Sequence, residues 1–522
     1  MTLLKFAIVI HEYFSFQATV AGSGPGAGSS HYSGSSGAGH GGRGGRGKSQ
    51  TRTGAFYGDF SRPQAFGSSG GGGSGNSIAT GGGVIHITAQ QMLHDGQITV
   101  NGKDALTNSD YGGGSGGSVF IEAGSFDGSG VIQANGGTGG GDAGGGGSGG
   151  RIAIHYNSTF FSGIISAYGG ASTIETGAAG TIYKMDESKG YSVLEVYNQG
   201  SKPSKETIDD YSHLASDSAR TWLTLSHIVG SPVPAAVQDI DVGPIIYEGL
   251  TIDEVKLGGS AHLAVEPDSS LTRLHTFRRF YGTFEGDSFG FLHVGPRQLV
   301  TIPNTDYYIP VNLKVYQSGY IQLPDRVMLH KNSLSLNAGY LIGVKDLTIS
   351  QCRVTFGAGS GAFITGSLQA THFKFQTVTI MSQGFLDMIA TNTKYSLEMD
   401  SLVINSGGVL TGRDVAIVAQ TVTVDESALI NLDARGQSCP ATDVYYAGSG
   451  GSHAGYGGFG FLGESSGGKR EDPFGSVFRP VAFGKAGYAG RSSSSCASGF
   501  GGGILNLTII GTLQLEGRIT SR

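Results

Sequence analysis

The sequence is poor in charge and proline and has no long apolar run, and each shortage excludes a class of protein. Only 14% of the 522 residues are charged, and the formal net charge is −6. So small a charge gives no strong field that would draw the chain to nucleic acid or to an anionic membrane. The 14 prolines and 92 glycines together make up about a fifth of the chain, below the roughly 25–30% typical of low-complexity disorder. No run of 18 apolar residues occurs, so we expect no membrane-spanning helix.

Glycine, in contrast, is abundant and concentrated. Of the 40 residues from Tyr111 to Gly150, 19 are glycine, and similar densities hold from Gly22 to Gly83 and from Gly448 to Gly503. Ordering a glycine costs more backbone entropy than ordering any other residue. These stretches are therefore expected to fold only where a regular framework holds them in register.

A repeat of short strands supplies that framework. Glycines or other small residues precede an alternating apolar run in "GGGVIHITAQ", "GGSVFIEAGS", "GGRIAIHYNS" and "AAGTIYKMDE". The runs begin at Val84, Val119, Ile152 and Thr181, so the interval between them shortens gradually along the chain. Second short strands follow in "GQITVNG", "GVIQANGG" and "GIISAYGG". Two or three short strands per ~20–35 residues form one coil of a parallel β-helix, here with alternate side chains such as Ile85 and Ile87 pointing inward.

The strand pattern continues through the middle of the chain with less glycine. Its apolar cores begin at Leu347, Val378, Leu402 and Val422, again at intervals that shorten along the chain. We therefore predict an all-β chain that forms a parallel, right-handed β-helix or solenoid with long glycine-rich loops. The predicted segments are a first glycine-rich β-helix module (1–187), an irregular insertion or lid with a short helix (188–233), a solenoid with fewer glycines (234–436) and a second, truncated glycine-rich module (437–522).

An internal duplication decides how the first glycine tract is interpreted. Residues 37–47, "GAGHGGRGGRG", resemble an RNA-binding arginine-glycine tract. However, "AFYGDFSRPQAFGSSG" (55–70) and "PFGSVFRPVAFGKAG" (473–487) are two copies of one motif, each between a His-containing glycine tract and a strand pair. The second copy lacks the arginines of the first tract, and neither copy has a basic groove with stacking aromatics. A structured corner loop is therefore favoured over RNA binding, and we expect no nucleic-acid partner.

The duplicated motif also contains the residues to which we assign a structural loop role. These are Arg62, Pro63 and Phe66 in the first copy and Arg479, Pro480 and Phe483 in the second. An arginine half-buried beside proline and phenylalanine can donate hydrogen bonds to loop carbonyls and fix the glycine coil. A ligand-binding role is less well supported, because no partner constellation lies nearby in the sequence.

These motifs together resemble a known group of proteins. "GAGHGGRGG", "YGDFSRPQAFGSSGGG", "GGSVFIEA" and "GGRIAIHY", with "SDSARTW" and "FLHVGP" in the middle, are similar to the uncharacterised glycine-rich β-helix proteins of eukaryotic cell surfaces, including plant glycine-rich membrane proteins. The resemblance implies an extracellular or surface location within a larger protein and brings no catalytic residues. It favours a non-enzymatic structural or adhesive solenoid whose partner is extracellular matrix or a cell-surface glycan or protein.

A carbohydrate-active, pectinase-like β-helix enzyme, or a polysaccharide-binding module, is the main alternative. Polygalacturonase-like sites use Asn-x-Asp, an Asp pair, Gly-His-Gly and a basic triplet in that order, because carboxylates must flank a glycosidic bond. This chain has Gly39-His40-Gly41, Asp209-Asp210 and Asn304-Thr305-Asp306, in the opposite order and without the triplet. Zinc-type spacings are missing, and the Asp/Gly calcium repeat is represented by one fragment around Asp142. We therefore expect no catalytic site, metal or cofactor.

The three cysteines and two sequons bear on the cell compartment. Cys439 and Cys496 flank the second glycine module at positions with no cysteine in the first, so a disulfide between them is expected in an oxidising compartment. Cys352, in the expected strand "SQCRV", is better explained as a packed thiol. Asn157 and Asn506 begin N-glycosylation sequons, the latter at the outward position equivalent to His86.

The two termini favour a fragment of a larger protein. "MTLLKFAIVIHEYF" is a poor signal peptide, because Lys5 interrupts its apolar run, and it reads better as a strand. The last residues, "GRITSR", match a point at which the first module continues through two more coils. Exposed strand edges at a solenoid end are expected to promote self-association.

Overall fold

The strands are the main regular secondary structure in the residues that the computed structural model describes. The described residues are 9–10, 23–48, 52–72, 79–107, 109–199, 221–223, 246–265, 276–287, 289–296, 298–304, 307–316, 318–364, 370–388, 394–435, 473, 482–483 and 501–521. Over these ranges there is no α-helix, and nearly all strand pairs are parallel, so the predicted all-β class is confirmed. The contacts divide the chain into unit 1 (1–305 and 309–322) and unit 2 (306–308 and 323–522).

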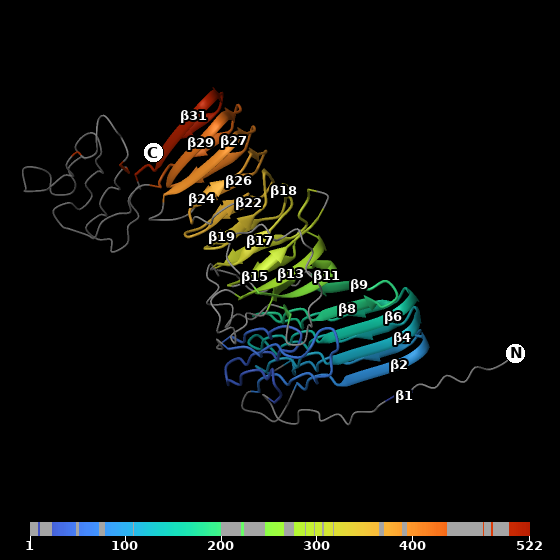
Figure 1. Ribbon diagram of the computed structural model, residues 1–522. Coiled ribbons are helices and arrows are strands. Elements are labelled where there is room, and N and C mark those ends of the chain that lie inside the picture. Colours follow the sequence, from blue (N-terminus) through green and yellow to red (C-terminus); the bar gives the residue numbers. More distant parts are fainter. Residues whose placement is uncertain are drawn as a thin grey trace, which may run out of the picture. The chain divides into compact units, whose positions relative to one another are not determined.

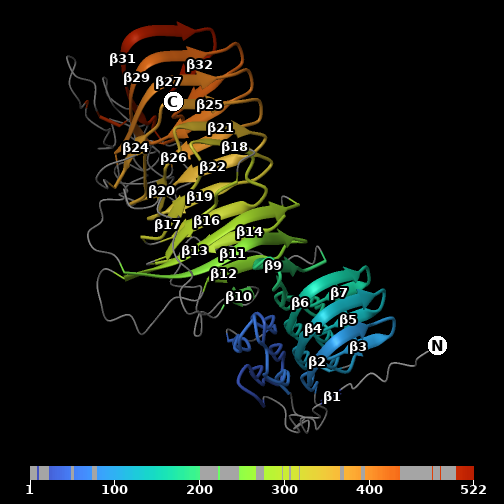
Figure 2. The same ribbon diagram turned by 45° about the vertical axis from the view of Figure 1, so that its right-hand side comes forward.

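Unit 1 begins with two columns of parallel strands, drawn in blue to green in Figures 1 and 2. The long column contains β2 (Val84–Leu93), β4 (Ser118–Gly128), β6 (Arg151–Phe161) and β8 (Thr181–Asp186). The short column contains β3 (Gln97–Thr99), β5 (Val131–Gln133) and β7 (Ile164–Ser166). Ile85, Val119, Ile152 and Ile182 lie in register. The repeat is thus confirmed, with the predicted starts of the first and last runs displaced by one residue.

The core of these rungs follows from the alternation of the strands. Val119, Ile121, Ile152 and Ile154 are buried together, and Ile85 and Ile87 pack against them, as predicted from the period of two. His86, Phe120 and Ala153 point to the opposite, outer face of the same strands, because they occupy the intervening positions. This outer face is the part of unit 1 on which the candidate site lies.

The strand direction reverses at β9 (Tyr191–Tyr197). β9 pairs antiparallel to β8, whereas β11 (Ile246–Gly258) is parallel to β9. The connecting turn favours this reversal, because Asp186 accepts backbone hydrogen bonds from Ser188 and Lys189, and Gly190 has a φ of +62°. The reversal falls at the start of residues 188–233, where the sequence indicated an irregular insertion or lid, and the first part of that segment instead forms the strand β9.

The rest of unit 1 consists of parallel strands in two further columns. The first contains β11, β13 (Thr276–Gly286), β15 (Gln298–Thr301) and β17 (Tyr320–Gln322). The second contains β10 (Thr221–Leu223), β12 (His262–Val265), β14 (Phe291–Val294) and β16 (Asn312–Tyr316). Most of the predicted insertion 188–233, including its expected helix, lies outside the described residues. β1 (Val9–Ile10) pairs antiparallel to β2.

Unit 2 has three columns of parallel strands, seen as stacked rungs in Figure 2. One contains β18 (Arg326–His330), β21 (Asp346–Ser350) and β25 (Thr377–Ile380), and a second β20 (Tyr340–Ile342), β23 (Gly361–Phe363) and β24 (His372–Lys374). Longer strands then continue both columns: β27 (Tyr395–Ile404), β29 (Asp414–Val424) and β31 (Ile504–Leu515). The third contains β19 (Leu334–Asn337), β22 (Arg353–Phe356), β26 (Phe385–Met388), β28 (Val409–Gly412), β30 (Leu429–Asn431) and β32 (Arg518–Thr520).

The register of unit 2 agrees with the sequence prediction. Leu347, Val378, Leu402 and Val422 stand directly opposite one another on neighbouring strands, and their side chains are buried. The apolar pattern fixed this register because a slip of one residue would turn every inward side chain outward.

The glycine-rich tracts of unit 1 form a layer of their own. This glycine layer comprises residues 23–48, 52–72, 79–82, 101–107, 109–117, 134–150 and 167–180, and parts of it appear as blue irregular segments beside β2 and β4 in Figure 1. The amides of Gly37, Ala38 and Gly39 donate to the carbonyls of Gly45, Gly113 and Gly26, at three different places in the layer. The amides of Gly145, Gly146 and Gly147 donate in the same way to Ser35, Glu175 and Gly137. Successive residues therefore form hydrogen bonds in three different directions. This pattern indicates extended chains with about three residues per turn, as in polyproline II.

Glycine is required in this layer by close backbone approach. A Cβ added at Gly37 would lie 1.9 Å from the carbonyl oxygen of Gly146, and one added at Gly147 would lie 2.0 Å from that of Gly114. Neither position has a positive φ, so contact distance and not an unusual dihedral excludes side chains here. Residues 37–47 belong to this layer and are largely buried, which agrees with the structured segment expected from the duplication.

Candidate functional site

The candidate site is built on the outer face of β4 and β6, where a segment of the glycine layer crosses the strands. Residues 55–66, here called the strap, accept three hydrogen bonds on backbone carbonyls from outward strand residues. The Arg151 Nε donates to Tyr57 (2.9 Å), the Ser118 Oγ to Ala65 (2.6 Å), and His155 Nε2 lies 2.9 Å from the oxygen of Ser61. The polar residues of the outer face therefore hold the strap in place.

Aromatic contacts hold the strap further. Phe60 is buried and meets Tyr183 of β8 edge to face, with 5.4 Å between ring centroids. Phe120 is also buried, stacked on His86 at 4.8 Å and beneath the Arg62 guanidinium at 5.7 Å. Apolar burial is thus added to the polar contacts on a sheet face that alternation alone would leave exposed.

The predicted loop motif occupies the strap, but with different roles for its members. The Arg62 side chain is 60% exposed and its Nη1 lies 3.6 Å from Glu122 Oε1. Pro63 is buried, and the half-buried Phe66 accepts a hydrogen bond on its carbonyl from the Tyr57 hydroxyl. The contact to a loop carbonyl expected of Arg62 is made by Arg151, which is fully buried. Sequence reasoning missed Arg151, and the only available signal was its position at the start of a strand after two glycines.

The second copy of the motif is described at one predicted position. The ring of Phe483 lies 4.8 Å from the Arg413 guanidinium carbon, in unit 2. Arg479 and Pro480 lie outside the described residues.

Beside the strap, the outer face is hollowed into a groove of about 460 Å³. Its polar lining comes from neighbouring strands: Thr88, Gln90, Glu122, His155, Asn157 and Glu187. Ala89, Ala123 and Gly124 complete the lining with small residues. We call this cavity the outer groove.

The two carboxylates of the outer groove each lie against a basic side chain. Glu122 is 3.6 Å from Arg62 and 3.5 Å from His86 Nε2, while Glu187 Oε1 is 2.8 Å from His155 Nδ1. Both remain open to solvent, with 34% and 46% of their side chains exposed. These contacts orient the two carboxylates, which line the groove and can accept hydrogen bonds there. Such an arrangement suits hydroxyl-rich ligands better than free cations.

His40 and Asn304, the described side chains of the pectinase-like alternative, do not line this groove. His40 is fully buried, donates from Nδ1 to the carbonyl of Gly116 (2.7 Å) and stacks on Tyr57. Burial, followed by the charge of Arg151, lowers the pKa of His40 to about 3. The amide of Asn304 exchanges two hydrogen bonds with the backbone of Phe284. Asp209, Asp210, Thr305 and Asp306 lie outside the described residues.

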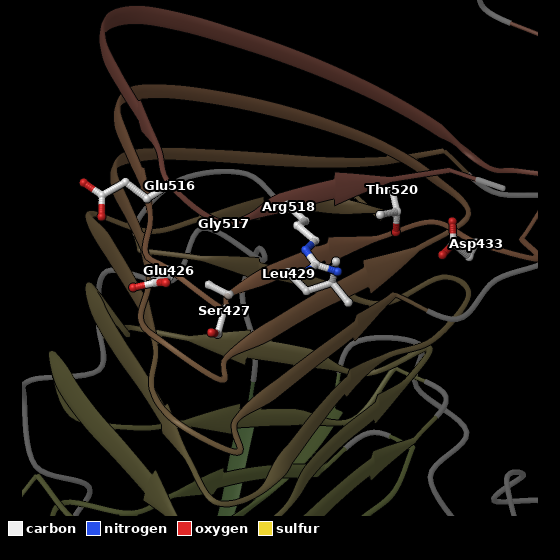
Figure 3. A pocket seen from close by; sticks show the side chains of 9 residues that line it. Glu426, Ser427, Leu429, Asp433, Glu516, Gly517, Arg518 and Thr520 are labelled. Atoms are coloured by element: carbon white, nitrogen blue, oxygen red, sulfur yellow. The ribbon is translucent and has the colours of Figure 1, made fainter.

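A second cavity, of about 520 Å³, lies in unit 2 on the outer side of β30 and β32 (Figure 3). Glu426, Asp433, Glu516 and Arg518 line it. Glu426 and Glu516 lie on adjacent turns, whereas Asp433 lies beyond the other end of these strands (Figure 3). Three carboxylates therefore line the cavity without converging on one point. In the described part of the chain, no three His, Cys, Asp or Glu side chains are placed to hold a metal ion.

The predicted cysteine and glycosylation positions are placed as follows. Cys352 lies in the turn between β21 and β22, not in a strand, and its thiol donates to the Leu329 carbonyl (3.3 Å). Burial raises the pKa of this thiol to about 11, which makes it unreactive. Asn157 and Asn506 are both exposed, as glycosylation requires. Cys439 and Cys496 lie outside the described residues.

Comparisons with known proteins add no family to these observations. No family model, no curated protein and no solved structure matches the chain. No helix among the described residues is long and apolar enough to cross a membrane. The resemblance to glycine-rich surface proteins therefore stays a prediction from the sequence.

Proposed function

We propose that the protein is a non-enzymatic, extracellular structural or adhesive scaffold and part of a larger surface protein. In this proposal the parallel columns wind as a right-handed β-solenoid. The observation that carries it is the glycine layer, in which backbones bond in three directions at distances that exclude a Cβ. Such a layer joins many rungs at once, whereas a simple repeat protein connects each rung only to its neighbours. Resistance to extension is the property that this cross-linking supplies.

The arginines of residues 37–47 support a structural role in place of RNA binding. Arg46 Nε lies 2.7 Å from the buried carboxylate of Glu175, which also accepts the Arg46 backbone amide. The Arg43 guanidinium lies 5.7 Å from the ring centre of Phe56. Both cations are engaged within unit 1, so they are poorly placed to neutralise phosphates.

Pulling single full-length molecules from their two ends tests the mechanical role. One rung runs from Leu402 to its partner Val422 in unit 2, and from Ile85 to its partner Val119 in unit 1. A rung of roughly 20–35 residues, at ~3.4 Å per residue, gives length steps of about 70–120 Å when it unfolds. We expect such steps in unit 2 and, because the glycine layer links its rungs, a larger cooperative event in unit 1. A smooth extension without force peaks would contradict the scaffold role.

The extracellular location has its own test. A non-reducing peptide map of protein purified from its own cells should show Cys439 linked to Cys496, or a glycan on Asn157. Free thiols at both cysteines together with an unmodified Asn157 would remove the extracellular assignment.

Carbohydrate recognition is a second candidate function, favoured by the paired carboxylates of the outer groove. Because Glu122 and Glu187 repel anions, neutral oligosaccharides should bind and oligogalacturonates should not. Calorimetry with both classes tests this, using Glu187→Gln as the groove variant and Glu426→Gln in unit 2 as the matched control. Release of new reducing ends that both Glu122→Gln and Glu187→Gln abolish, and Glu426→Gln does not, would replace the non-enzymatic proposal with a glycosidase.

A further inference from the structure

The last long strand of unit 2 has one open edge. β31 pairs with β29 through ten aligned residues from Ile504 to Leu515, and no strand in the described part of the chain pairs with its other edge. Among the described strands, β32 likewise pairs only with β30. The sequence of β31, ILNLTIIGTLQL, contains neither a charged residue nor proline. Natural edge strands are usually guarded by such residues against pairing, so this edge lacks the ordinary protection.

The apolar interior is open at the same rung. Leu513 and Leu515 are each 45% exposed and Ile519 is 37% exposed. Their partners one rung earlier, Val422, Val424 and Ile430, are at 0%. One further rung would cover these side chains as β31 and β32 cover the rung before them.

The chain itself contains the template for that rung. By the internal duplication, "GGGILNLT" and "GRIT" of β31 and β32 correspond to "GGGVIHIT" and "GQIT" of β2 and β3. In unit 1, β4 pairs in parallel with β2, and β5 with β3. The edges that are open in unit 2 are therefore occupied in the first copy, by the repeat that contains the glycine-rich residues 102–117.

We propose that the open edges of β31 and β32 are a docking surface for one β-repeat of the kind formed by residues 102–133. The incoming repeat has a glycine-rich segment followed by two strands, both parallel to their partners. Its first strand pairs as β4 pairs with β2, so that a residue equivalent to Ser118 stands opposite Ile504. Its residue equivalent to Phe126 covers Leu513, because Leu513 aligns with Met92, and its residue equivalent to Ile132 covers Ile519. This surface goes beyond the scaffold role and does not depend on it, because it rests on strand pairing alone.

The proposal is tested by fusing such a repeat to the C-terminus of the full-length protein. The duplication aligns Thr520 with Thr99, so a copy of residues 102–187 joined after Arg522 continues the alignment in frame. In the matched control, the copies of Val119 and Ile121 in that extension are replaced with aspartate. Hydrogen exchange with mass spectrometry then follows the amides of β31 and β32, with those of β21 as an internal reference. Tethering makes the docking intramolecular, so weak pairing is still detected.

Docking predicts at least about tenfold slower exchange in β31, in β32 and in the added strands, and no protection in the aspartate control. A second variant, Leu513→Lys with Leu515→Lys, alters only part-exposed side chains and should abolish the added protection while circular dichroism stays unchanged. An extension that exchanges as fast as an unfolded peptide would overturn the proposal. Concentration-dependent protection of the unextended chain, with a doubled mass in light scattering, would also overturn it by assigning the edge to a second copy.

Discussion

Replacing Gly147 with alanine adds a single Cβ and so tests whether close backbone approach in the glycine layer requires glycine. The new Cβ would lie 2.0 Å from the carbonyl oxygen and 2.5 Å from the carbonyl carbon of Gly114. Both atoms belong to backbone, so no flexible side chain can move aside. The Gly147 amide also donates to Gly137 (2.9 Å), and moving the segment to relieve the overlap would break that bond.

The expected loss of stability follows from these two effects. Overpacking a filled interior costs about 1–3 kcal/mol, and a lost buried backbone hydrogen bond adds about 1 kcal/mol. For a unit as large as unit 1, a loss of about 3 kcal/mol corresponds to a fall in Tm of about 4–5 °C. Calorimetric melting of the full-length Gly147→Ala variant measures this shift.

Gly83→Ala is the matched control, because a Cβ added at Gly83 meets nothing within 4 Å. Alanine reduces the entropy of the unfolded chain, so this variant should be neutral or about 0.5 kcal/mol more stable. Equal melting temperatures for the two variants would refute the argument that backbone approach, and not conformational freedom, requires glycine in the layer.

Three further predictions concern buried polar groups of unit 1. In the folded state the imidazole of His40 stays neutral down to its pKa of about 3, whereas in the unfolded chain it is protonated below its ordinary pKa of 6.5. The unfolded state therefore binds the extra proton between these values. The free energy of unfolding should fall as the pH drops from about 6.5 to 3, by about 1.4 kcal/mol per pH unit. His40→Asn should remove that part of the slope in urea titrations at several pH values, and an unchanged slope would count against the buried neutral ring. Arg151→Lys should cost about 1–3 kcal/mol in urea unfolding, because the strap carbonyl of Tyr57 loses its donor; no loss would mean that the strap is held by other contacts. Glu175→Gln should cost about 1–2 kcal/mol in the same assay, because the ion pair between Arg46 and the buried Glu175 carboxylate is lost. A gain in stability would show that the desolvation cost of this carboxylate exceeds the stabilisation from the ion pair.

The sequence predicted the strands and their register well, for a physical reason. In β2, β4 and β6 one face is mainly apolar, and only one alignment of an alternating pattern keeps that face inward. The same argument predicted that Leu347, Val378, Leu402 and Val422 share one column. Local alternation therefore carried enough information to align strands that lie far apart in the chain.

Three features depended on information that the alternation does not carry. The reversal between β8 and β9 is set by a four-residue turn around Asp186 and Gly190, at the start of a segment that the sequence indicated only as an irregular insertion. The glycine tracts were expected as corner loops, because no side-chain pattern shows which backbones bond across them. Arg151 was missed for a similar reason: its partner Tyr57 lies 94 residues away, and only the fold brings them together.

Hydrogen exchange of the native full-length chain tests most directly whether the glycine tracts are a folded scaffold. If the tracts are folded, the amides of residues 112–117 and 144–150 exchange as slowly as those of β4 and β6, because each donates a hydrogen bond to a neighbouring backbone carbonyl in the layer. Exchange at the rate of an unstructured peptide in these tracts, with β4 and β6 still protected, would contradict the account. It would return residues 37–47 to the class of flexible arginine-glycine segments.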